Sequence, residues 1–323
     1  MPPSKSTIGN TMKVAYLMLV HKNPRLLRRA IGALSSEGCG FFIHIDRKSD
    51  VREFAGITGS NVFLSEPRRS IYWAEFSNVE AEMQLIRQAL DSSAEYDYLV
   101  FMQGSDYPLR SGKYIQSFFE QNRGAEFMSL VKMPAPGFPI SKINTIRYTS
   151  DKPIRRLTFR VMARLGLAQR DWRKYLEALE PFAGDACWAL SRNACRHILD
   201  FNATNPHVSN FFRHTHVPEE SFFHTILGNS PFLPRMRRSL LYRDWPGTNA
   251  HHPETLTERH VKLFEEQEKV WGDDQFGSGE MLFARKFSDA NLHVVDRIDE
   301  MIRRKDNDKI TDAYSETAPK LDV

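Results

Sequence analysis

Apolar and polar positions along this chain change their spacing in a regular order, and the spacing predicts alternating strands and helices. Short apolar runs predict four strands, at residues 14–20, 40–46, 62–64 and 98–102. The segments between them predict three helices, near residues 24–34, 50–56 and 76–90. Asn23 is the expected N-cap of the first helix, with Pro24 at its first position. This alternation indicates an α/β fold with a mixed, mostly parallel sheet flanked by helices.

Polar residues follow three of the predicted strands. His21 comes directly after the first strand, Asp46 closes the second, and Asp106 lies just beyond the strand that ends near residue 102. In open α/β sheets, ligands bind outside the carboxyl ends of the strands. We therefore expect His21, Asp46 and Asp106 to contact a ligand. Asp46 and Asp106 fit equally well as residues that stabilise the turns in which they lie.

The remaining segments define the expected organisation of the chain. Residues 1–11 are expected to be a disordered leader, residues 12–302 a single domain, and residues 303–323 a polar C-terminal tail. A basic helical insertion is expected at about residues 133–180, beginning with an irregular proline-containing stretch up to residue 150.

Within this insertion, two stripes of residues repeat at helical spacing. Leu157, Val161 and Leu165 form an apolar stripe, and an arginine stripe runs beside it at Arg156, Arg160 and Arg164. The pattern favours a helix whose apolar stripe packs on the core and whose arginines face solvent. The alternative is that residues 153–174 contact a membrane surface or an anionic acceptor.

The composition of the 323 residues is that of an ordinary globular protein, with 41% hydrophobic and 26% charged residues. The net charge of +4 favours anionic ligands such as nucleotides, but it is too small to imply nucleic acid. The three cysteines, Cys39, Cys187 and Cys195, form no disulfide framework. No signal peptide and no apolar run long enough to span a bilayer are evident. We therefore expect a cytoplasmic protein, with peripheral contact at the inner membrane face through the basic insertion.

Two acidic residues lie at a predicted helix start. Pro218, Glu219 and Glu220 precede the apolar run that begins at Phe222. Proline suits the first helical position, and carboxylates in the first turn interact favourably with the positive end of the helix. The two acids are therefore explained by helix stability alone. Together with Asp106 and a late pair of cations, however, they also fit a site that moves a group from a phosphate-containing donor.

The late cations are Arg285 and Lys286, which follow a short apolar stretch. Two cations at this place can neutralise a diphosphate leaving group without a metal ion, although such a pair is commonly surface charge. Trp245 lies beside Pro246 and fits either the apolar face of a sugar or a loop anchor.

Histidines near Glu220 allow a zinc site to be drawn from His214, His216 and His224. The pattern lacks the second helical histidine of the zinc-peptidase signature, so it is unspecific. An Asp-x-Asp pair that would hold Mg²⁺ or Mn²⁺ occurs only at Asp306 and Asp308, in the expected tail. We therefore predict no metal site and no cofactor.

Seven short blocks of the sequence, taken in order, resemble glycosyltransferase family 14, which contains the core-2/I-branching β-1,6-N-acetylglucosaminyltransferases and the peptide O-xylosyltransferases. The blocks lie at residues 19–31, 43–49, 70–77, 104–109, 184–192, 218–227 and 282–287. They cover most of residues 12–290, and their order makes the resemblance specific.

The resemblance implies a GT-A-like, Rossmann-type fold and an inverting transfer from a UDP-sugar without a divalent metal. In the family, the glutamate that closes a Pro-Asp-Glu motif is the catalytic base, which corresponds to Glu220. The lysine of a late motif binds the donor diphosphate, which corresponds to Lys286, with Arg285 as a helper. His21, Asp46 and Asp106 are the other expected donor contacts.

The expected acceptor contacts are Glu219, Trp188 and Trp245. The resemblance leaves open GlcNAc or xylose as the donor sugar, and a glycan, a lipid-linked glycan or a protein as the acceptor. This chain has Pro-Glu-Glu where the family has Pro-Asp-Glu, and the family's second phosphate-binding arginine has no clear match near His252. The alternatives are a non-catalytic nucleotide-sugar-binding protein of the same fold, a nucleic-acid-binding protein and a zinc hydrolase.

Overall fold

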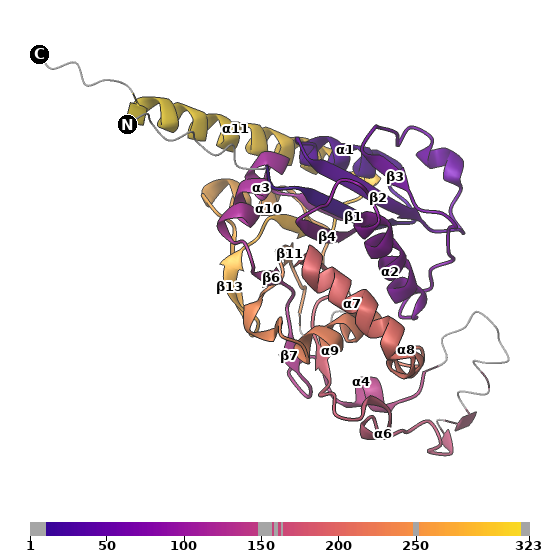
Figure 1. Cartoon of the computed structure of the whole chain (residues 1–323). Coiled ribbons are helices and arrows are strands. Elements are labelled where there is room, and N and C mark those ends of the chain that lie inside the picture. The colour runs from indigo at the N-terminus through magenta and orange to yellow at the C-terminus, as the bar shows by residue number, and fades with distance from the viewer. Residues whose placement is uncertain (1–10, 148–156, 158–160, 163, 248–251, 318–323) are drawn as a thin grey trace, which may run out of the picture.

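A seven-stranded sheet forms the centre of the structure (Figure 1), a computed structural model that describes residues 11–147, 157, 161–162, 164–247 and 252–317. In spatial order its strands are β10 (Met236–Arg237), β6 (Glu126–Phe127), β9 (Trp188–Ser191), β4 (Tyr98–Gln103), β1 (Val14–Val20), β2 (Cys39–Ile45) and β3 (Val62–Leu64). Neighbours pair in parallel except at β9, which is antiparallel to both β4 and β6. The predicted mixed, mostly parallel α/β sheet is confirmed.

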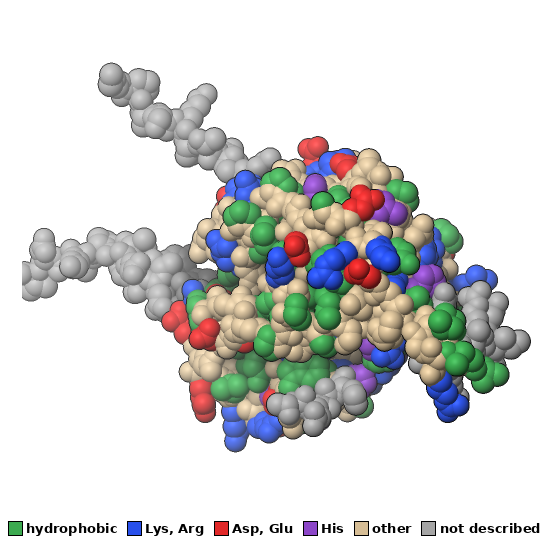
Figure 2. Space-filling model, turned by 90° about the horizontal axis from the view of Figure 1, so that it is seen from below, with side chains coloured by type: hydrophobic (Ala, Val, Ile, Leu, Met, Phe, Trp, Pro, Cys, Tyr) green, Lys and Arg blue, Asp and Glu red, His purple; other side chains and the backbone are tan. Residues whose placement is uncertain are grey.

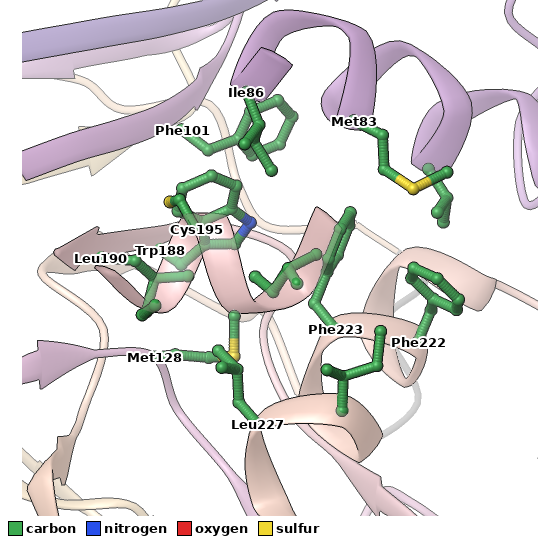
Figure 3. Packing of buried hydrophobic residues seen from close by; sticks show 14 of the residues in the cluster. Met83, Ile86, Phe101, Met128, Trp188, Leu190, Cys195, Phe222, Phe223 and Leu227 are labelled. Atoms are coloured by element: carbon green, nitrogen blue, oxygen red, sulfur yellow. The ribbon is translucent and has the colours of Figure 1, made fainter. Parts of the chain in front are cut away.

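Strand β1, next to the central strand β4, is buried on both faces and contributes to two hydrophobic cores. Ala15, Leu17 and Leu19 point to one core, which the helices α2 (Ser77–Leu90), α7 (Arg192–Thr204) and α9 (Phe222–Gly228) complete (Figure 3). The alternate residues of β1 point to a second core with α1 (Pro24–Leu34) and α3 (Gly112–Gln121). Helices therefore cover both faces of the sheet, which explains the continuous apolar run in the sequence.

Three smaller sheets accompany the main sheet in the described residues. In one of them, β14 (Phe283–Arg285) lies between β11 (Leu241–Arg243) and β5 (Asp106–Pro108). A hairpin joins β12 (Trp271–Asp274) to β13 (Gly277–Glu280), and β7 (Val131–Lys132) pairs with β8 (Phe182–Ala183). The other helices are α4 (Ser141–Asn144), α6 (Arg173–Leu176), α8 (Pro206–Phe212), α10 (Glu258–Glu266) and α11 (Leu292–Thr317). The 3₁₀ turns are η1 (Val51–Phe54), η2 (Pro218–Glu220), η3 (Leu233–Arg235) and η4 (Asp289–Asn291).

Asn23 occupies the predicted N-cap position of α1 and Pro24 the first helical position, but the Asn23 side chain does not cap the helix. Asn23 adopts a left-handed backbone conformation with φ 61°, and its side chain makes no cap hydrogen bond. Instead, the carboxylate of Asp289 accepts the N–H groups of Arg25 and Leu26, the latter at 2.7 Å. The Asn23 amide donates to the carbonyl of Gly104 at 3.4 Å. A residue of η4, from the other end of the sequence, therefore caps the first helix.

Two other boundaries differ from the prediction. The helix expected near residues 50–56 is the single 3₁₀ turn η1. The tail expected from residue 303 continues α11 without a break, and Lys305 donates from Nζ to the carbonyl of Phe264 at 2.8 Å. The expected leader lies, except for its last residue, outside the described residues.

The apolar stripe of the basic insertion does not pack on the core. Leu157, Val161 and Leu165 are exposed to 62%, 48% and 66%. Arg156 and Arg160 lie outside the described residues, and Arg164 is exposed. The prediction of a buried stripe is therefore wrong. Within the part of the chain that the structure describes, every helix is too short or too polar to cross a bilayer.

Leu227 on α9 lies fully buried in the core of Figure 3, whereas Leu233 in η3 is 39% exposed. We predict that Leu227→Ala lowers the free energy of unfolding by about 2–5 kcal/mol, because it leaves a cavity in a packed core. Leu233→Ala, the matched control, should change it by less than about 0.5 kcal/mol. Urea denaturation measures both values, and equal losses would contradict the assignment of α9 to the core.

Candidate active site

The carboxyl ends of three parallel strands bring the predicted ligand residues to one edge of the sheet. His21 follows β1, Asp46 follows β2, and Asp106 begins β5 shortly after β4. Burial lowers the pKa of His21, the positive charge of Lys22 lowers it further, and Asp46 raises it. The ends of β1 and β2 lie side by side, since the N–H of Asp46 donates to the carbonyl of Val20 at 2.8 Å.

Asp46 stabilises the turn after β2. Its Oδ1 accepts the N–H of Lys48 at 2.9 Å and the N–H of Ile71 at 3.3 Å, and the side chain is buried. Its other oxygen lies 3.6 Å from the ammonium of Lys48. Of the two readings that the sequence left open for Asp46, these contacts favour the turn-stabilising one.

Asp106 and Arg285 form a buried ion pair between β5 and β14. Asp106 Oδ1 accepts from Nε of Arg285, and Oδ2 accepts the N–H of Gln103 at 2.8 Å. Nη1 of Arg285 donates to Oε1 of Gln103 at 2.8 Å. Burial on its own lowers the pKa of the Arg285 guanidinium, but the Asp106 carboxylate outweighs this effect and raises it. Arg285 is therefore a fixed charge inside the edge of the sheet.

Lys286 is placed differently from its neighbour. Its side chain is half-buried, and among the described residues no carboxylate oxygen lies within 4.0 Å of its ammonium group. Burial lowers the pKa of Lys286, and the charges of Arg285 and Lys22 lower it further. Lys22 and Lys286 thus place positive charge at the end of β1 that no described acid neutralises. Such a place favours an anion.

A second buried ion pair lies beside the first. Strands β11 and β14 are parallel, and Arg243 is in register with Arg285. Arg243 pairs with Asp185, which also accepts from the hydroxyl of Ser239 at 3.0 Å. Burial on its own raises the pKa of Asp185, but Arg243 outweighs it and lowers the pKa. Neither Asp185 nor Arg243 was predicted as a site residue, although Asp185 lies within the block at residues 184–192.

Glu220 is attached to this network through its backbone. It ends the 3₁₀ turn η2, and its carbonyl accepts the N–H of Gly184, the neighbour of Asp185, at 2.9 Å. A side chain at position 184 would overlap the carbonyl of Ser129, so only glycine allows this close approach. The Glu220 side chain is 31% exposed, and its Oε2 accepts from Nζ of Lys142 at 2.9 Å. The α-helix predicted from Pro218 begins only at Phe222.

Glu219 points into the protein, so it does not fit the predicted acceptor contact. Its side chain is 8% exposed, and its Oε2 is buried without a hydrogen-bond partner among the described residues. Burial raises the pKa of Glu219 to about 8, and the charge of Glu220 raises it as well. Across the interior, the carboxyl of Glu82 on α2 also has a raised pKa, because of burial and the charge of Glu219.

Trp188 is also out of reach of an acceptor. It is 2% exposed and stacks on Phe101 with ring centroids 5.5 Å apart. Figure 3 shows both side chains inside the core. Its Nε1 donates to Oε2 of Glu82 at 3.3 Å. The acceptor role predicted for Trp188 is therefore wrong, because a buried indole in a core cluster has no surface to offer.

Two tryptophans are exposed near the candidate site. Trp245 is 46% exposed, and the guanidinium of Arg243 lies 5.6 Å from the centroid of its ring. Trp73, which the sequence analysis gave no role, is 68% exposed. The rings of His216 and His252 lie edge-on to it at 5.8 and 6.4 Å. Exposed aromatic rings of this kind suit the apolar faces of sugars.

The histidines do not form the zinc site that was drawn from the sequence. Among the described residues, the one group of potential metal ligands that lie close together is Asp244, Glu254 and His260. The guanidinium of Arg259 contacts both carboxylates of this group, so the protein itself supplies the positive charge. His224 is buried, its Nε2 lies 3.0 Å from the carbonyl of Asp185, and burial lowers its pKa to about 4.

The sequence matches the model of the Core-2/I-Branching enzyme family over residues 14–267. Since this match covers most of the chain, the protein belongs to that family. The predicted family resemblance is confirmed.

Curated relatives agree with this assignment. The chain is 24% identical over 222 residues to mouse (Mus musculus) β-1,3-galactosyl-O-glycosyl-glycoprotein β-1,6-N-acetylglucosaminyltransferase 4, covering 66% of this chain and 46% of the relative. It is 24% identical to xylosyltransferase 1 of Canis lupus familiaris over 71% of this chain and 24% of the relative. It is 23% identical to xylosyltransferase sqv-6 of Caenorhabditis elegans over 89% of this chain and 36% of the relative. The chain thus spans less than half the length of these relatives, all of which are named glycosyltransferases.

The buried carboxyl of Glu219 makes stability depend on pH. Because its pKa is about 8 in the folded protein and near 4.5 when unfolded, the unfolded chain releases this proton first. We predict that stability falls between pH 4.5 and 8, by up to about 1.4 kcal/mol per pH unit for this group. Glu219→Gln should reduce that fall, whereas the surface variant Glu180→Gln should leave it unchanged. Urea denaturation at pH 5 and pH 8 measures the difference, and parallel pH profiles for Glu219→Gln and wild type would contradict it.

Proposed function

We propose that this protein is an inverting glycosyltransferase that moves GlcNAc or xylose from a UDP-sugar to a hydroxyl group of a glycan or protein. Glu220 is the general base, and the reaction needs no divalent metal ion. The observation that carries the proposal is the link between Glu220 and the cations at the edge of the sheet. The carbonyl of Glu220 holds Gly184, the adjacent Asp185 pairs with Arg243, and Arg243 is in register with Arg285.

The proposed reaction is a single displacement at the anomeric carbon. The carboxylate of Glu220 removes the proton of the acceptor hydroxyl while that oxygen attacks the carbon from the face opposite UDP. The bond between the anomeric carbon and the diphosphate oxygen breaks, and UDP leaves with the electron pair. The configuration is therefore inverted, and the proton remains on Glu220 until it passes to solvent.

Lys286 is the proposed contact for the departing diphosphate. Its ammonium group has no carboxylate partner among the described residues, unlike the guanidinium of Arg285. The charge of Lys22 lies close enough to lower the pKa of Lys286. Fixed charges that meet developing negative charge in a site of low polarity stabilise a transition state strongly. Asp106 and Gln103 already engage Nε and Nη1 of Arg285, and its Nη2 is buried without a hydrogen-bond partner among the described residues, so Arg285 contributes mainly through its charge.

Lys142 is a positioning residue for the proposed base. Its ammonium donates to Oε2 of Glu220, so the carboxylate is held in one orientation. Among the described residues Oε1 has no hydrogen-bond partner, which leaves it available to the acceptor hydroxyl. Trp245 and Trp73 are the exposed aromatic side chains proposed to contact the sugar rings of the acceptor.

We predict that Glu220→Gln lowers the rate of transfer by about 10²–10⁴-fold, because the amide cannot accept the acceptor's proton. Binding of UDP should stay within twofold of wild type. The matched control is Glu180→Gln, which removes another carboxylate that pairs with a lysine, Lys132, on the surface. Product formation from UDP-GlcNAc and UDP-xylose measures the rate. Undiminished transfer by Glu220→Gln would overturn the role of Glu220, and UDP binding without transfer by the wild type would favour a non-catalytic binding protein.

Lys286→Ala should weaken UDP binding by roughly ten- to a hundredfold, since a hydrogen bond to a charged group contributes about 1.5–3 kcal/mol. Isothermal titration calorimetry in EDTA measures the dissociation constant, and we expect the wild type to bind UDP under this condition. Lys132→Ala is the control. If EDTA abolishes binding by the wild type, metal independence is wrong; if Lys286→Ala binds UDP as well as wild type does, the assignment of Lys286 is wrong.

A further inference from the structure

A second cleft lies away from the residues proposed for catalysis. It has a volume of about 890 Å³ and is formed by α3, the β12–β13 hairpin, the segment around β10 and the middle of α11. In Figure 1, α3 and β13 lie on the same side of the molecule. Its walls include Tyr114, Arg238, Lys269, Trp271 and Glu280. The whole β12–β13 hairpin lies beyond residue 267, where the match to the family model ends. A cleft of this size accommodates a ligand of small-molecule dimensions.

The walls of this cleft carry more positive than negative charge. Lys113, Arg237, Arg238 and Lys269 line it, against Glu280 and Asp306. Glu280 pairs with two cations, because its Oε1 lies 3.5 Å from Nε of the buried Arg110 and its Oε2 lies 3.8 Å from the ammonium of Lys269, and Oε1 also accepts from the hydroxyl of Tyr114 at 2.8 Å. The cleft therefore attracts anions.

Arg238 has unused hydrogen-bonding capacity in this wall. The residue is 5% exposed, and its Nη2 donates to Asp274 at 3.0 Å. Nε and Nη1 have no acceptor among the described residues. Both groups are buried, and Gly272 of the hairpin lies against the guanidinium, so Arg238 acts on a ligand in the cleft through its charge.

The remaining lining suits a carbohydrate. Trp271 is 58% exposed at the cleft and offers a flat apolar face. Hydroxyl and amide side chains line part of the wall, namely Ser111, Ser117, Gln121, Asn122 and Ser278, and Phe118, Phe127 and Leu240 add apolar surface. An exposed aromatic ring together with several neutral hydrogen-bonding groups matches the alternating apolar and hydroxyl surfaces of a sugar.

We propose that this cleft binds an anionic saccharide, a short oligosaccharide that carries carboxylate or sulfate groups. Trp271 contacts a sugar ring, and Lys269, Lys113 and Arg238 attract the acidic groups. The inference does not use Glu220 or Lys286, so it stands independently of the proposed transfer reaction.

Calorimetric titration with three saccharides tests the proposal: trigalacturonate with carboxylates, a heparin tetrasaccharide with sulfates, and neutral chitotriose. We expect at least one anionic saccharide to bind and chitotriose to bind at least tenfold more weakly. Trp271→Ala should weaken binding about tenfold, the range for loss of an aromatic side chain central to an interface. Lys269→Gln should weaken it several-fold, and added salt should weaken it further.

The control variants are Lys132→Gln and Glu180→Gln, which lie outside the cleft and outside the proposed active site and should bind the saccharide as the wild type does. Absence of binding by both anionic saccharides overturns the proposal. So does equal binding of chitotriose, equal binding of inorganic phosphate alone, or unchanged affinity in Trp271→Ala. Because the experiment measures saccharide binding and not transfer, a failure of the transfer reaction is distinguishable from a failure of this cleft.

Discussion

The buried ion pair of Asp106 and Arg285 is the contact on which the arrangement of the candidate active site depends. It joins β5, next to the central strand β4, to β14, which arrives from late in the sequence. Taking two charges out of water is costly, and the attraction between them compensates only if their other hydrogen bonds are made. Gln103 supplies two of those bonds, through its N–H to Asp106 and its Oε1 to Arg285, while Nη2 of Arg285 has no partner among the described residues. The pair therefore fixes the register in which β14 adds to the edge of the sheet.

The same pairing explains why two adjacent cations have different properties. Arg285 is turned inward and meets Asp106, whereas Lys286 is half-buried and meets no described carboxylate. An arginine suits the first position because its guanidinium forms several directed hydrogen bonds at once, and a lysine suits the second because it is a compact charge. One cation is thus committed to structure, and the other remains available to an anion.

The sequence predicted β1, β2 and β4 because these strands are continuous apolar runs that are buried at nearly every position. It did not predict β9, or β6 and β10, which are only two residues long. The rule that ligands bind at strand ends singled out His21, Asp46 and Asp106, and the structure places all three at one edge of the sheet. It did not single out Asp185 or Lys142, because their contacts join distant segments that no spacing records. The capping contact of α1 was missed for the same reason, since Asp289 acts across 263 residues of sequence. Trp188 shows another limit of the sequence. A tryptophan in the sequence can be a surface for a sugar or a buried core residue, and its sequence neighbours do not distinguish the two.

Glu219 and Glu220 show how far the backbone decides the chemistry of identical side chains. On the 3₁₀ turn η2, Glu219 points between η2 and α2, and Glu220 points outward to Lys142. Burial keeps Glu219 protonated near neutral pH, while Oε2 of Glu220 accepts a hydrogen bond from the ammonium of Lys142. A neutral inner carboxyl adds no negative charge beside the proposed base. The longer side chain that this protein has in place of the aspartate of the Pro-Asp-Glu motif carries that carboxyl further into the interior, toward Glu82. The departure from the motif is therefore compatible with an outer glutamate that acts as a base.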